Sequence, residues 1–110
     1  MTILAPTTSG TFDANGELLL FDVRGLGASA LQLSGTFSAT VQFEGSLDGA
    51  TFVSVNMKPT NSATAASSAT GAGVWLANIT GFKLLRARVS AYTSGSASAT
   101  FMGASTGGSR

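Results

Sequence analysis

Two pairs of ionisable residues lie close enough in the sequence to act together. Glu44 and Asp48 stand in the stretch FEGSLDGATF, and Arg86 and Arg88 stand in FKLLRARVSAY. Neighbouring carboxylates could act as acid and base or bind calcium, and neighbouring guanidinium groups could hold a carboxylate or a phosphate. Catalysis and ligand binding at these pairs need further side chains, such as a base or additional ligands. The rest of the composition therefore decides which of these functions remain possible.

The groups that most enzymes use are missing from this sequence. It contains no histidine and no cysteine, which removes the commonest general base, the commonest nitrogen ligand for metals and every thiol nucleophile. We therefore expect no enzymatic activity, no catalytic residue, no cofactor and no metal. Calcium held by Glu44, Asp48, carbonyl oxygens and the distant Asp13 or Asp22 is an alternative. Lysine or tyrosine chemistry is another, although nothing in the sequence places a lysine beside a partner group.

The surroundings of Glu44 and Asp48 favour a turn over a site. Asp48 and Gly49 separate two runs of alternating apolar residues, and Asp-Gly in that position is a strong signal for a β-hairpin. Gly49 adopts a positive φ at little steric cost, and aspartate tolerates the same region. Since the sequence nearby supplies no base and no third carboxylate, we predict a hairpin that carries no chemistry.

The arginine pair and the single tryptophan are candidates for contacts with a partner protein. Arg86 and Arg88 share one face of a predicted strand, where they could pair with Glu44 or Asp22 across strands or hold a group on another subunit. Trp75 could pack in a core or an interface, or it could form a platform for a sugar. Without interleaved aromatic residues, two arginines do not make a nucleic-acid site.

The elements that must position these residues are predicted to be strands. Serine, threonine and glycine interrupt almost every window that could form a helix. Alternating or apolar segments bounded by turn residues cover residues 16–25, 29–35, 38–45, 51–58, 73–81, 82–92 and 97–104. About seven short strands joined by glycine-rich turns predict an all-β fold, a jelly-roll-like antiparallel β-sandwich. We expect an N-terminal arm over residues 1–12, the sandwich over 13–105 and a flexible tail over 106–110.

The low charge of the chain predicts protein–protein contacts. Charged residues make up 10% of the sequence, against about 25% in an average soluble domain. The formal net charge of +1 gives no field to attract nucleic acid or an acidic membrane. No apolar run approaches the roughly 20 residues of a membrane span, and the N-terminus does not look like a secretory signal. Residues 59–82 carry no charge, so we expect the loop within them either to stay mobile or, if it is ordered, to be ordered by a partner surface.

A family resemblance extends over about residues 28–104. The stretches LQLSGTFSATVQFEGSLDGATFVSV and GVWLANITGFKLLRARVSAYTSGSASATF resemble small β-sandwich virion proteins of tailed bacteriophages. Those proteins carry an S-G-T-F-S-A-T-V-x-F-E-G-S-x-D-G hairpin, a G-x-W element, a G-F/Y-x-x-x-R-x-R/K strand and an S-G-S-A-x-A-x-F strand. Related patterns occur in head decoration proteins, in tail or fibre parts and in carbohydrate-binding modules.

The resemblance implies a structural virion protein, and we expect a capsid decoration (cement) protein on the phage head, assembled in the host cytoplasm. Its partners would be the major capsid protein and copies of itself in a dimer or trimer. The arm would supply Ile3, Leu4 and Pro6 as an apolar anchor, and Arg86, Arg88 and Trp75 would be further interface residues. The alternative is a tail, neck or fibre component, or a module that binds a glycan or receptor through an exposed Trp75 or Tyr92.

Overall fold

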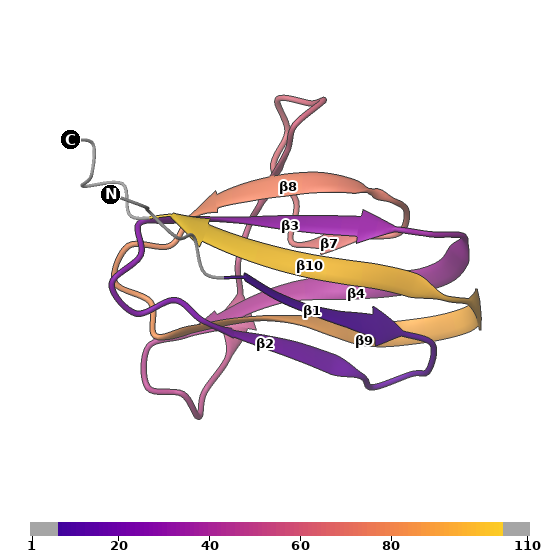
Figure 1. Cartoon of the computed structure of the whole chain (residues 1–110), viewed down its shortest axis with the longest axis horizontal. Coiled ribbons are helices and arrows are strands. Elements are labelled where there is room, and N and C mark those ends of the chain that lie inside the picture. The colour runs from indigo at the N-terminus through magenta and orange to yellow at the C-terminus, as the bar shows by residue number, and fades with distance from the viewer. Residues whose placement is uncertain (1–6, 105–110) are drawn as a thin grey trace.

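The computed structural model describes residues 7–104, which form ten β-strands in two antiparallel sheets (Figure 1). The strands are β1 (Thr7–Phe12), β2 (Leu18–Asp22), β3 (Ala28–Ser34), β4 (Phe37–Ser46), β5 (Val53–Ser54), β6 (Lys58–Pro59), β7 (Ser68–Ala69), β8 (Gly73–Asn78), β9 (Leu84–Gly95) and β10 (Ala97–Ala104). Sheet 1 has the order β1-β10-β3-β8-β6. Sheet 2 has the order β2-β9-β4-β5, and β7 also pairs with β4.

The chain passes from one sheet to the other at most of its turns. Strands β1, β3, β8 and β10 lie in sheet 1, and the strands that join or follow them, β2, β4 and β9, lie in sheet 2. In sheet 1, β1 pairs with β10, and β3 lies between β10 and β8. In sheet 2, β2 pairs with β9, and β4 pairs with β9 on one side and with the short strands β5 and β7 on the other. This winding is that of a jelly roll, so the predicted β-sandwich is confirmed.

The core lies between the sheets and follows the alternation of the sequence. Leu31, Leu33, Val41 and Phe43, which the pattern places on inward faces, are each at most 1% exposed. Phe101 stacks on the ring of Phe21 with 5.5 Å between centroids. Burial of each such side chain contributes about 1.5–3 kcal/mol to folding, so these side chains favour packing of the two sheets against each other.

The N-terminal boundary of the sandwich differs from the expected one. Thr7–Phe12, assigned from the sequence to an arm, is strand β1 and pairs with β10 along its whole length. Phe12 is 3% exposed in the core, and it anchors the strand. The strand was not predicted because its other positions carry serine, threonine and glycine, whereas the alternation that indicates a strand is recognised from large apolar residues. Residues 1–6 and 105–110, with the expected arm residues Ile3, Leu4 and Pro6, lie outside the described part.

The uncharged loop before β8 is ordered by this chain itself, so the prediction that a partner surface orders it is wrong. Ala66 pairs with Met57, and Ser68–Ala69 form β7 against Gln42 and Val41 of β4. The reason is that β5 covers β4 only at Glu44 and Gly45, which leaves backbone groups of β4 free. The loop satisfies them, for example through the Phe43 N–H, which donates to the Ser67 carbonyl at 2.8 Å.

Candidate functional site

The outer face of sheet 2 carries a cluster of one carboxylate and two guanidinium groups. Glu44 on β4 pairs with Arg86 on β9, and Arg88 is two residues further along the same face. Arg86 Nε donates to Glu44 Oε1 at 2.7 Å, and Arg88 Nη2 donates to Glu44 Oε2 at 2.9 Å. The Glu44 side chain is 12% exposed, so one partly buried carboxylate is shared by both arginines.

The two arginines share one carboxylate, so the cluster keeps one net positive charge. The hydrogen bond from Arg88 is the largest influence on Glu44, and together with Arg86 it outweighs burial and holds the pKa of Glu44 below its usual value. The same contact raises the pKa of Arg88. The guanidinium carbon of Arg86 also lies 3.9 Å from the centre of the Phe52 ring, a cation–π contact. Pairing of the arginines within the chain, one of the two interpretations of the sequence, is therefore what the structure shows; their contact with a partner stays a prediction.

Asp48 organises the turn between β4 and β5. Its Oδ1 accepts the backbone N–H of Ala50 and of Thr51, both at 2.8 Å, and the hydroxyl of Ser46 at 2.9 Å. The hydrogen bond from Thr51, followed by those from Ala50 and Ser46, lowers the pKa of Asp48 to about 2. Gly49 has φ 83°, and β4 pairs with β5. The predicted hairpin is confirmed, although its loop spans residues 47–52 rather than two residues.

Trp75 belongs to the core, which corrects its assignment as an interface residue. It is 8% exposed, and its ring lies 5.6 Å from that of Phe43. It faces inward because β8 alternates, with Trp75 and Ala77 buried and Leu76 exposed. Tyr92 is half-buried and its hydroxyl donates to the Gly95 carbonyl at 2.8 Å. The exposed Trp75 expected for a sugar platform is thus not present.

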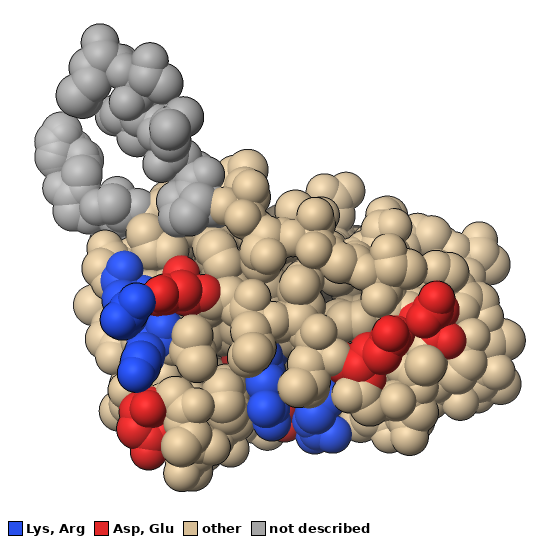
Figure 2. Space-filling model, turned by 60° about the horizontal axis from the view of Figure 1, so that its bottom comes forward, with Lys and Arg blue, Asp and Glu red and all other residues tan. Residues whose placement is uncertain are grey.

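Within residues 7–104, no group of three or more acidic residues could hold a metal ion. The acidic and basic residues visible in Figure 2 gather in a few small clusters, and most of that face is formed by uncharged residues. The same described range contains no helix long and apolar enough to cross a membrane.

The outer face of sheet 1 is almost free of charge. Lys58 on β6 is the only charged residue in the five strands of this sheet. The outward positions of the remaining strands carry small polar or apolar residues: Thr7, Ser9 and Thr11 on β1, Ser98, Thr100, Met102 and Ala104 on β10, Ala28, Ala30, Gln32 and Ser34 on β3, and Val74, Leu76 and Asn78 on β8. Such a face has little hydration to lose when it is covered by another protein.

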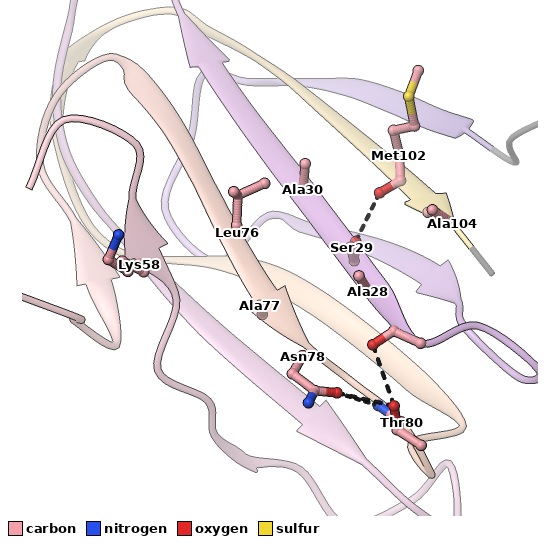
Figure 3. Close-up of a pocket in the computed structure, with 12 residues that line it drawn as sticks. Ala28, Ser29, Ala30, Lys58, Leu76, Ala77, Asn78, Thr80, Met102 and Ala104 are labelled. Carbon is pink, nitrogen blue, oxygen red and sulfur yellow. Dashed lines mark hydrogen bonds between the residues drawn. The ribbon is translucent and has the colours of Figure 1, made fainter. Parts of the chain in front are cut away.

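An apolar hollow lies at one end of this face, across β8, β3 and β10 (Figure 3). Its volume is about 740 Å³, and its apolar rim includes Leu76 and Met102, which are 51% and 49% exposed. Two hydroxyl groups around it are already paired, and the side chain of Lys58 also lines it. The Ser29 hydroxyl donates to the Met102 carbonyl at 3.0 Å, and the Thr80 hydroxyl donates to Asn78 Oδ1 at 2.9 Å. The hollow therefore suits a mostly apolar group, and Lys58 adds one positively charged side chain to its lining. No sequence pattern marked it, because its residues come from four separate segments.

The fold and these surfaces define a small jelly-roll β-sandwich in which the outer face of sheet 1 is almost free of charge. Solved structures that share this fold include the following two. The SPBc2 prophage-derived protein YomS aligns with a TM-score of 0.75 and 15% sequence identity, over 94% of this chain and 98% of YomS. The PBSX exported protein XepA aligns with a TM-score of 0.76 and 24% identity, over 94% of this chain and 39% of XepA. At these identities the likeness shows the fold alone.

No protein-family model matches this sequence, and no curated protein matches it either.

Proposed function

We propose that this chain is a structural protein of a bacteriophage particle, a decoration protein that binds the outside of the head and stabilises contacts between capsomers. The observation that carries the proposal is the outer face of sheet 1, which has one lysine in five strands and an apolar hollow. Exposed apolar surface of this kind marks a site of protein contact. The resemblance of residues 28–104 to phage virion proteins supports it, and so does the name of YomS, a prophage-derived protein with the same fold.

In this proposal the protein acts by adding contacts and not by catalysing a reaction. The face of sheet 1 covers a surface of the major capsid protein. Few charges have to be stripped of water, and its short side chains lose little rotamer entropy. A subunit that binds only the assembled head stabilises that head by mass action. Copies of the chain associate with one another, and assembly takes place in the host cytoplasm.

Co-sedimentation with phage heads that lack their decoration protein tests the proposal. Wild-type protein should sediment with the heads, and Met102→Asp should lose at least tenfold in affinity, because its cross-strand neighbours Ala30 and Thr7 offer no charge and a buried carboxylate without a partner is costly. The matched control is Leu18→Asp, since Leu18 is 47% exposed on the outer face of sheet 2. Loss of binding in the control alone would move the interface to the side of Arg86 and Arg88. Wild-type protein that never sediments with heads would refute the proposal.

The location on the head is tested separately. Gold-labelled protein added to particles should appear on the head in electron micrographs. Label on the tail, neck or fibres would replace decoration by the alternative component role while leaving the structural role intact. Binding on a glycan array would instead favour the receptor-binding module.

A further inference from the structure

The outer face of sheet 2 carries cationic groups that the chain neutralises only in part. Arg86 and Arg88 share the single carboxylate of Glu44. Arg86 donates to Glu44 through Nε, and Arg88 donates to it through Nε and Nη2. Within residues 7–104, the two Nη groups of Arg86 and Nη1 of Arg88 have no acceptor. The cluster therefore keeps unpaired donors as well as a positive charge.

These unpaired N–H groups are accessible from the solvent. The side chains of Arg86 and Arg88 are 21% and 36% exposed. In the part of the chain that the structure describes, no buried side-chain nitrogen lacks a hydrogen-bond partner, so the unpaired nitrogens of both arginines reach the surface. A guanidinium group presents its donors in a planar fork, which matches the two oxygens of a carboxylate. This part of the surface therefore suits a carboxylate from another molecule.

Two exposed leucines lie beside the arginines on the same face. Leu18 is the cross-strand neighbour of Arg88, and Leu20 is that of Arg86. They are 47% and 49% exposed, whereas Phe21 of the same strand is buried in the core. Cross-strand neighbours have Cβ atoms about 5 Å apart, so apolar contact and positive charge are offered side by side. A ligand that fits both has a carboxylate next to an apolar side chain, which is the chemistry of an acidic protein segment.

This chain is itself a poor source of that carboxylate. Residues 1–6 and 105–110 contain no aspartate and no glutamate. Every acidic residue except Asp13 already accepts hydrogen bonds within the chain: Glu17 from two backbone N–H groups, Asp22 from Arg24, Glu44 from Arg86 and Arg88, and Asp48 from its turn. A second copy would therefore offer only Asp13. Charge complementarity favours a different polypeptide as the occupant.

A protein also fits this surface better than a nucleic acid or an anionic membrane. Both of those present many phosphates, whereas the formal net charge of the whole chain is +1. Binding to phosphates grows with the number of cations that contact them, and one uncompensated charge contributes little. On a nucleic acid, Leu18 and Leu20 would also lie against charged phosphates instead of apolar groups.

We propose that the outer face of sheet 2 is a second docking surface, which binds an acidic segment of a partner protein. A carboxylate of that segment accepts hydrogen bonds from the unpaired N–H groups of the arginines, chiefly the more exposed Arg88. An adjoining apolar side chain of the segment covers Leu18 and Leu20. The surface is opposite the face of sheet 1 and concerns a different partner. The inference does not depend on binding to a phage head, and it is tested on the isolated protein.

Nuclear magnetic resonance titration with short synthetic peptides tests this surface. The probe is a glycine- and serine-rich peptide with leucine–glutamate–leucine at its centre. Matched peptides carry glutamine in place of the glutamate, or serine in place of both leucines. At millimolar concentration the acidic peptide should shift the side-chain Nε–H signals of Arg86 and Arg88 and the methyl signals of Leu18 and Leu20. The glutamine peptide should bind about tenfold more weakly, and the serine peptide about threefold more weakly.

Three variants separate the charged part of the surface from the apolar part. Arg88→Gln should weaken binding of the acidic peptide about tenfold, and it leaves Glu44 paired with Arg86. The matched control is Arg24→Gln, because Arg24 uses both Nε and Nη2 on Asp22, and it should bind like the wild type. Leu20→Ser keeps the charged cluster intact and should weaken binding about threefold. The fluorescence of the buried tryptophan checks that each variant is folded.

Several results would overturn the proposal. The signals of Arg86 and Arg88 could stay unchanged at millimolar acidic peptide, or the glutamate and glutamine peptides could bind equally well. Tighter binding of a short DNA duplex, or of vesicles that contain phosphatidylserine, would assign the surface to phosphates instead. Arginine signals that move with the concentration of the protein alone, and stop moving in Asp13→Asn, would show that the occupant is a second copy.

Discussion

Replacing Glu44 by glutamine tests whether the charged cluster stabilises the sandwich. The variant keeps the shape of the side chain and removes the charge that Arg86 and Arg88 share. Hydrogen bonds to a charged group contribute about 1.5–3 kcal/mol each, whereas exposed ion pairs contribute about 0–1 kcal/mol. Glu44 is 12% exposed and its partners are 21% and 36% exposed, so the cluster lies between these limits. We expect Glu44→Gln to lower the free energy of unfolding by about 1–3 kcal/mol at pH 7.

The assay is unfolding in urea, followed by the fluorescence of the single tryptophan, Trp75, which leaves the core on unfolding. A loss of about 2 kcal/mol moves the midpoint by about 1 M urea. Asp22→Asn is the matched control, because Asp22 pairs with Arg24 at side-chain exposures of 52% and 66%. Its midpoint should move by less than half as much.

The pH dependence identifies the charge as the cause. The pKa of Glu44 is lower in the folded protein than in the unfolded chain. The unfolded state therefore binds more protons, and the contribution of Glu44 is present above about pH 4.3 and is lost as the pH falls through the folded-state pKa. The difference between wild type and Glu44→Gln should shrink from pH 7 to pH 3. An equal midpoint at pH 7, or a difference that stays constant down to pH 3, would refute the reasoning.

Two further predictions concern the β4–β5 region. Gly45→Ala should destabilise the fold by about 1–3 kcal/mol in the same urea assay, because a Cβ there would lie 2.7 Å from the Phe82 ring. The control Gly71→Ala should be close to neutral, because no atom lies within 4 Å of the added carbon. Equal effects of the two substitutions on stability would contradict the packing argument. The amide proton signals of Ala50 and Thr51 should titrate with the pKa of Asp48, with a midpoint at about pH 2, and a midpoint near the ordinary value of about 3.9 would show that these hydrogen bonds do not form.

The regular alternation of strands could be predicted, because it depends on local sequence. Leu31, Phe43 and Leu85 occupy inward positions that a period of two residues assigns directly. Strands β1 and β7, which were missed, are short or built from serine, threonine and glycine, and the predicted strand 51–58 is instead divided between β5 and β6, which lie in different sheets. They exist because β10, β8 and β4 have backbone groups to satisfy, and that requirement depends on where other segments lie.

In the candidate sites too, some features were predictable from local sequence and others depend on where distant segments lie. The conformational preferences of Asp48 and Gly49 predicted a turn from local sequence. The six-residue length of the loop between β4 and β5 depends on hydrogen bonds to Asp48. The sequence offered two interpretations of Arg86 and Arg88. The position of Glu44 on the next strand shows that they pair within the chain, and their contact with a partner stays a prediction. Trp75 was assigned to an interface, but the register of β8 turns its ring inward.

The sequence alone determined that this protein is an all-β chain of low charge without the usual catalytic side chains, since composition and alternation are properties of the chain itself. Tertiary structure alone decided which residues form its surfaces. The shared carboxylate joins residues more than 40 positions apart in the sequence, and the hollow joins β3, β8 and β10. Such contacts follow from how the two sheets are wound and paired, and no local pattern encodes them.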